Sequence, residues 1–76
     1  MTHKPVVYSA HAVTRLKERC ITRRDVRAVL AAGIVSDAAN GGSRKDRVVD
    51  GRRIAVIYRE YSSRIHIWTV MLVPGD

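Results

Sequence analysis

The fold is decided by residues 9–33, which read SAHAVTRLKERCITRRDVRAVLAAG. Ser9 is a favourable N-cap, because its hydroxyl can accept a hydrogen bond from a free backbone N–H of a first helical turn. The apolar side chains that follow recur at the spacing of one helix face. They are Ala12, Val13, Leu16 and Cys20. We therefore predict a helix over residues 10–19.

A second helix is predicted over residues 23–32. Thr22 followed three positions later by Asp25 resembles a capping box, in which two side chains satisfy two free backbone N–H groups. Gly33 is expected to end this helix as a left-handed cap. Only Cys20, Ile21 and the capping Thr22 separate the predicted helices, so the chain must form a corner between them, and Ile21 is expected to fill it.

The rest of the chain has the pattern of strands. Segments rich in Val, Ile, Tyr and Thr predict strands over residues 34–38, 44–50, 53–61 and 64–73. Asn-Gly-Gly-Ser, Asp-Gly and Ser-Ser supply turns between them. Val6–Tyr8 forms either a short strand or a staple over the first helix. The expected fold is α+β, with two N-terminal helices packed on one face of a four-stranded antiparallel sheet.

Apolar residues occupy both faces of the last two predicted strands. Strict alternation places Ile54 and Val56 on one face and Ile57 on the other, and it separates Ile67 from Val70. The helices can cover only one of these faces. The second face is then either exposed to solvent or covered by another copy of the chain in a homodimer. Alternatively, the sheet is curled and the chain termini cover part of this face. The sequence leaves these alternatives open.

The length predicts a single domain over residues 1–76. A chain of this length buries only about 60% of the surface that its unfolded form exposes, so a partner would add stability. Cys20 is the only cysteine, which excludes an internal disulfide and is typical of a reducing cytoplasm. The three histidines lack the spacing of metal ligands, so neither a metal site nor a cofactor is predicted. We see no signal peptide and no run of about 20 apolar residues that would span a membrane.

The chain is strongly basic, with 14 Lys and Arg against 7 Asp and Glu and a net charge of +7. Most of the cations are Arg, whose guanidinium group suits phosphate recognition and base stacking better than an ammonium group does. A small domain of this charge is typical of proteins that bind nucleic acid, an acidic protein or an anionic membrane surface. The alternative is a charge that only keeps the surface soluble.

One polar stripe runs along the first predicted helix, formed by His11, Arg15, Glu18 and Arg19. The positive end of the helix dipole favours a neutral His11 ring, which could act as a general base. Arg15, one turn further on, could bind a phosphate through two hydrogen bonds. Such a pair suits cleavage of RNA, because a base can take the proton of a 2′-hydroxyl that DNA lacks. By itself, the same pattern is more often a solvated helix face.

Nearly the whole chain resembles a known pattern. Ser9 to Arg15 follows Ser-x-His-Ala-x-x-Arg, Glu18 to Ile21 follows Glu-Arg-Gly-Ile with one change, and Asp25-Val26 opens a helix that Gly33 closes. These motifs resemble a bacterial and phage-associated family of uncharacterised small domains. Its first-helix motif is fairly specific, whereas the sequence pattern of its β half, which ends here in the strand with Thr69, is not. That family is similar in fold to RelE-like and barnase-like toxins.

The resemblance implies a function and its residues. Domains of this kind are commonly metal-independent ribonucleases that an acidic antitoxin or an immunity protein neutralises. Carried onto this chain, the resemblance implies His11 as the acid or base and Arg15 as the phosphate ligand. It also implicates Thr69 as a third catalytic residue. The basic residues expected to contact an RNA backbone are Arg19, Arg53 and Arg59, of which only the first belongs to the signature.

Cys20 stands where the signature has Gly. A left-handed backbone at this position would cost roughly 1 kcal/mol or more, since a side chain disfavours that conformation. We expect Cys20 to project to the apolar side of the helix as a buried thiol.

The leading hypothesis is a RelE-like toxin that cleaves RNA or binds it on the ribosome. The alternative is a non-enzymatic basic module that binds nucleic acid or protein through its Arg and Lys side chains. A third hypothesis is an interaction protein that forms a homodimer through the second face of its sheet.

Overall fold

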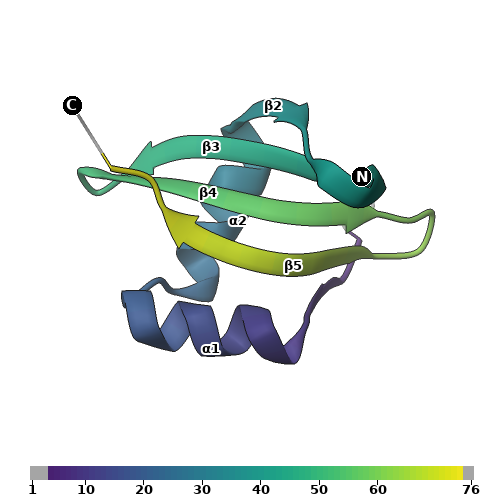
Figure 1. Cartoon of the computed structure of the whole chain (residues 1–76), viewed down its shortest axis with the longest axis horizontal. Coiled ribbons are helices and arrows are strands. Elements are labelled where there is room, and N and C mark those ends of the chain that lie inside the picture. The colour runs from purple at the N-terminus through teal and green to yellow at the C-terminus, as the bar shows by residue number, and fades with distance from the viewer. Residues whose placement is uncertain (1–3, 75–76) are drawn as a thin grey trace.

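The computed structural model describes residues 4–74, in which two helices pack on a five-stranded mixed sheet (Figure 1). The helices are α1 (Ala10–Arg19) and α2 (Arg23–Ala32). The strands are β1 (Val6–Tyr8), β2 (Ile34–Asp37), β3 (Ser43–Val49), β4 (Arg52–Glu60) and β5 (Ile65–Leu72), and a 3₁₀ turn, η1 (Ala39–Gly41), joins β2 to β3. They lie in the order β1-β5-β4-β3-β2. The predicted α+β class is confirmed.

The prediction of a four-stranded antiparallel sheet is wrong, because the sheet has a fifth strand that pairs in parallel. Strands β2 to β5 do form an antiparallel meander, but β1 joins the sheet and runs parallel to β5. The physical reason is the outer edge of β5, whose backbone groups need hydrogen-bond partners. Ser9 N–H donates to the carbonyl of Ile67 at 3.1 Å. Ile65 N–H donates to the carbonyl of Pro5 at 3.0 Å, so the N-terminal segment closes this edge.

Both helices begin and end at the predicted residues, and their caps explain why. Ser9 Oγ accepts a hydrogen bond from Ala12 N–H at 3.0 Å. Thr22 Oγ1 accepts from Asp25 N–H, and the Asp25 carboxylate accepts from Thr22 N–H, which completes the predicted capping box. The apolar sides of the helices pack on the sheet in one core. Its buried members are Ala12, Leu16, Ile21, Val26, Val29, Ile54, Val56, Tyr58, Ile67 and Val70.

An arginine from the sheet holds the corner between α1 and α2. Arg52 Nη1 donates to the backbone carbonyls of Arg19 and Cys20 at 3.2 and 3.0 Å. Its Nη2 donates to the Asp25 carboxylate at 3.3 Å. Ile21 is buried in the corner, as predicted. Cys20 has a left-handed backbone (φ 53°, ψ 43°), but its side chain is exposed. The predicted buried thiol is therefore wrong, because the left-handed residue turns its side chain away from the apolar side of α1.

Replacing Cys20 by Gly is expected to raise the free energy of unfolding by roughly 1 kcal/mol. Glycine removes the steric conflict of a side chain at φ 53°, and the exposed thiol makes no buried packing contacts that would be lost. Urea denaturation measures the difference, with Cys20→Ser as the control that keeps the conflict. A Gly variant no more stable than the Ser variant would contradict this account of the corner.

Gly33 does not form the predicted left-handed cap. Its backbone is extended (φ −74°, ψ 160°). Glycine is required here for space, because a Cβ atom would lie 2.5 Å from the carbonyl oxygen of Val29 and 3.0 Å from Cβ of Lys45. The absence of a side chain lets the chain leave α2 and enter β2 in close contact with β3.

A β-bulge in β5 breaks the strict alternation predicted from the sequence. Tyr58 pairs with Ile67, and the next pair of the ladder includes Thr69, so Trp68 is an additional residue without a partner of its own. The bulge shifts the phase of the strand. Ile67 and Val70, predicted on opposite faces, are consequently both buried in the core.

The two helices leave one face of the sheet uncovered. In Figure 1, α2 lies behind β3 and β4, α1 follows the outer edge of β5, and of the described helices and strands only the short η1 overlaps one end of the face turned toward the viewer. We call this the open face. It carries the side chains that alternate with the core, such as the paired residues Ile57 and Thr69, which are partly exposed, whereas Ala55 on the same face is fully buried. Cover of this face by the chain termini or by another copy of the chain stays a prediction.

Candidate functional site

Three side chains of α1 are joined on one polar flank of the helix. They are His11, Arg15 and Glu18, which we call the His11 group. Arg15 Nε donates to His11 Nε2 at 3.5 Å, and Arg15 Nη1 donates to Glu18 Oε1 at 3.1 Å. Spacings of four and three residues bring these side chains together on a helix surface. His11 is exposed and the other two side chains are 38% and 52% exposed, so a ligand can reach all three.

The contact between Arg15 and His11 has one possible direction. A guanidinium group has no acceptor, so in this contact Arg15 Nε is the donor and His11 Nε2 the acceptor. At 3.5 Å this contact is long, and a hydroxyl group of a ligand can replace it at Nε2. A neutral ring with an accessible lone pair is the form that a general base requires.

The His11 group faces away from α2. Val13 lies on the side of α1 that faces α2, since it lines a hollow together with Ile21 and Arg23. Arg15 is two residues further along, or about 200° round the helix, and so lies on the opposite flank.

Thr69 lies on β5 and is not joined to the His11 group. It pairs with Ile57 of β4 and precedes the buried Val70, so its side chain lies on the open face. Within residues 4–74, no hydrogen bond links Thr69 to His11 or Arg15. The catalytic role that the family resemblance implies for Thr69 stays a prediction.

The three arginines expected to contact an RNA backbone are spread over the molecule. Arg19 is exposed at the end of α1. Arg53 Nε lies 3.8 Å from the Asp46 carboxylate, and the guanidinium of Arg59 lies 5.4 Å from the centre of the Tyr61 ring. Arg53 and Arg59 alternate with core residues of β4, so both lie on the open face. Their contact with RNA stays a prediction.

An ion-pair cluster on the open face was missed by the sequence analysis. Arg44 donates to both carboxylate oxygens of Asp46 at 2.7 and 2.8 Å, and Arg53 approaches from β4. Only 8% of Asp46 is exposed. The hydrogen bonds from Arg44 hold the pKa of the Asp46 carboxyl below its usual value, although burial acts in the opposite direction. The signal that could have found this pair is the spacing of two residues, which puts both side chains on one strand face.

The lowered pKa of Asp46 predicts a loss of stability in acid. Its ionised form is stabilised in the folded state, so the contribution is complete above the unfolded pKa of about 3.9 and is lost as the pH falls through the lower folded pKa. We expect Asp46→Asn to be less stable than the wild type at neutral pH, with the difference shrinking below about pH 4. Asp50→Asn, in the exposed hairpin turn, is the control. Thermal unfolding at several pH values measures this difference. A stability difference between the wild type and Asp46→Asn that stays constant through the acid range would contradict the prediction.

Two further observations concern residues 4–74 alone. They contain no group of three His, Cys, Asp or Glu side chains placed to hold a metal ion. None of their helices is both long and apolar enough to cross a membrane. His66 lies on β5 opposite Arg59, and His3 lies outside the described residues.

A family model described as a domain of unknown function (DUF4258) matches residues 8–72. The match includes both helices, strands β2 to β5, and the three residues that the sequence analysis implicated in catalysis. No curated protein and no solved structure matches the chain. A relation to RelE-like toxins is not shown by these comparisons and stays a prediction.

Proposed function

The chain belongs to the DUF4258 family, and we propose that it is a RelE-like, metal-independent endoribonuclease with His11 as general base and Arg15 as phosphate ligand. The contact between Arg15 Nε and His11 Nε2 is the observation that carries the proposal. It sets a nitrogen lone pair and a guanidinium group within reach of a single phosphodiester. The net charge of +7 supports an anionic substrate, since it attracts the phosphate backbone.

The reaction we propose is transfer of the phosphodiester to the neighbouring 2′-oxygen. His11 Nε2 takes the proton of the 2′-hydroxyl, the 2′-oxygen bonds to phosphorus, and the bond from phosphorus to the 5′-oxygen breaks. The leaving 5′-oxygen takes a proton from water. Arg15 donates hydrogen bonds to the phosphate oxygens, on which negative charge grows in the transition state. The products are a 2′,3′-cyclic phosphate and a 5′-hydroxyl end.

Glu18 has a positioning role in this proposal. It accepts from Nη1 of Arg15 and so holds the guanidinium beside His11. Among the described residues no hydrogen bond occupies Nη2 of Arg15, which leaves that nitrogen for a phosphate oxygen. A guanidinium held in place before the substrate binds loses less freedom in the transition state.

Expression in a bacterial host tests the proposal. The wild-type protein is expected to degrade cellular RNA and to arrest growth, whereas His11→Ala and Arg15→Ala are expected to do neither at the same protein level. Both side chains are exposed or half-exposed, so these variants should fold. Intact RNA and normal growth with the wild-type protein would contradict the proposal.

A second candidate function is a non-enzymatic module that binds nucleic acid. An Arg and Tyr cluster at the turn between β4 and β5 favours it. The guanidinium groups of Arg59 and Arg64 lie 5.4 and 4.3 Å from the centre of the Tyr61 ring. Such a cluster offers flat surfaces on which unpaired bases can stack.

The binding module makes a different prediction from the nuclease. RNA affinity should fall steeply with salt and should weaken in Arg64→Ala, while His11→Ala leaves it unchanged. Fluorescence anisotropy with a labelled single-stranded RNA measures all three. Affinity that does not change with salt would exclude this alternative.

A further inference from the structure

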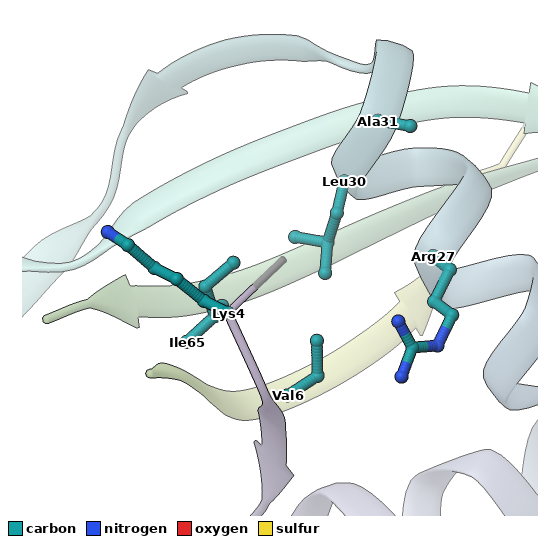
Figure 2. A pocket seen from close by; sticks show the side chains of 6 residues that line it. All are labelled: Lys4, Val6, Arg27, Leu30, Ala31 and Ile65. Atoms are coloured by element: carbon teal, nitrogen blue, oxygen red, sulfur yellow. The ribbon is translucent and has the colours of Figure 1, made fainter. Parts of the chain in front are cut away.

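A hollow of about 310 Å³ lies between α2, β1 and the start of β5 (Figure 2). Its apolar lining is formed by Val6, Leu30, Ala31 and Ile65, and its cationic lining by Lys4 and Arg27. In Figure 2, Leu30 projects from α2 toward Val6 of the N-terminal strand, and Arg27 lies beside them. Lys4 Nζ lies 2.6 Å from the Glu60 carboxylate, so its charge is paired, and Arg27 supplies the positive charge that has no ion-pair partner among residues 4–74. The hollow therefore combines an apolar surface with one unpaired cation.

Tyr8 lies beside this hollow with an unused hydrogen-bonding group. Its hydroxyl is buried and has no hydrogen-bond partner among the described residues. The guanidinium of Arg23 lies 4.7 Å from the centre of the Tyr8 ring. Burial raises the pKa of Tyr8, and the positive charges of Arg23 and Arg27 act in the opposite direction. A buried donor without a partner is costly, but this hydroxyl is closed to solvent, so the groups that a docked segment can reach here are the cations rather than the Tyr8 hydroxyl.

A second hollow extends the same surface toward α1. It is lined by Val13, Leu16, Lys17, Ile21, Thr22 and Arg23. Arg23 belongs to this hollow and also stacks on Tyr8, so it connects the two. The pattern repeats, with apolar side chains in the interior, cations at the rim and no acidic lining residue. We call the two hollows with Tyr8 between them the helix-side groove.

We propose that the helix-side groove docks an acidic amphipathic segment of a partner protein. Apolar side chains of that segment would enter the two hollows, and its carboxylates would pair with Arg23 and Arg27. The apolar linings favour a peptide over a nucleic acid, whose backbone has no apolar side chains to fill them. The positive rim, on a chain of net charge +7, selects an acidic peptide by charge complementarity.

The groove and the His11 group lie on different sides of α1. Val13 and Lys17 line the groove, whereas Arg15 lies on the flank away from α2. A segment bound in the groove leaves His11 open to solvent. The proposal is therefore independent of the proposed nuclease function, and it predicts that such a partner binds without competing for His11.

Nuclear magnetic resonance of the whole ¹⁵N-labelled protein tests this proposal. The probe is a synthetic helical peptide with Leu along one face and Glu on the others, and its control is a peptide of the same composition in scrambled order. We expect saturable binding of the amphipathic peptide, with amide shifts centred on Val6, Leu30, Ala31 and Ile65. Arg27→Glu should weaken binding by about tenfold or more, and Ala31→Glu should do likewise. Arg24→Glu is the matched control on the same helix, because Arg24 is exposed and lines neither hollow, and it should change the affinity by less than about twofold.

Several outcomes would overturn the proposal. One is the absence of saturation up to roughly 1 mM peptide. Another is a set of shifts centred on the His11 group or on the open face. Equal affinity for the scrambled peptide would show that binding depends on charge alone. Equal loss of affinity in Arg24→Glu and Arg27→Glu would show the same. Displacement of the peptide by an RNA oligonucleotide would assign the groove to nucleic acid instead.

Discussion

Replacing His11 by Ala is expected to lower the rate of RNA cleavage by a factor of about 10² to 10⁴. The substitution removes the only nitrogen lone pair that α1 holds beside Arg15. It removes an exposed side chain, so the free energy of unfolding should change by no more than about 0.5 kcal/mol. Single-turnover cleavage of a labelled RNA measures the rate, and binding of the same RNA should persist, since Arg15 remains.

His66→Ala is the matched control for this variant. His66 is partly exposed and pairs with Arg59, but it lies on β5 rather than on α1. Its removal should leave the cleavage rate within about threefold of the wild type, whereas a general base could not be removed without a larger loss. Equal rates for the two histidine variants would contradict the assignment of His11 as the base.

Replacing Ile54 by Ala is expected to lower the free energy of unfolding by about 2 to 5 kcal/mol. Ile54 is fully buried at 0% exposure, between the helices and the centre of the sheet. A domain of this length has a total stability of about 4 to 11 kcal/mol, so the variant should lose a large part of it. Urea and thermal denaturation followed by circular dichroism measure the change.

Ile34→Ala is the control for Ile54→Ala, because it removes the same atoms from a side chain that is 76% exposed. Its stability should stay within about 0.5 kcal/mol of the wild type. A loss as large as that of Ile54→Ala would show that β2 is covered in solution, as it would be in a homodimer.

Local signals explain which parts of the fold could be predicted. The helices follow from two caps within a few residues of each other, Ser9 and the pair Thr22 and Asp25, so their bounds were predicted correctly. The parallel pairing of β1 with β5 joins segments from opposite ends of the chain, and three residues carry too little pattern to reveal it. The bulge at Trp68 depends on how β4 and β5 fit together, which alternation alone does not contain.

The candidate sites divide in the same way. The His11 group was predictable, since its members are three or four residues apart on one helix. The position of Thr69 relative to it depends on the bulge and on the edge at which α1 lies. The helix-side groove could not be predicted, because Val6, Leu30 and Ile65 come from three elements that only the tertiary fold brings together.

The most direct test of the central claim is the chemistry of the cut. The purified protein, with EDTA present, is incubated with an RNA oligonucleotide and with the same sequence made as DNA, and the products are identified by mass spectrometry. We predict 2′,3′-cyclic phosphate ends from the RNA and no cleavage of the DNA, because the proposed nucleophile is the 2′-hydroxyl. Cleavage of the DNA, or RNA products that never pass through a cyclic phosphate, would contradict the assignment of His11 and Arg15 to this reaction.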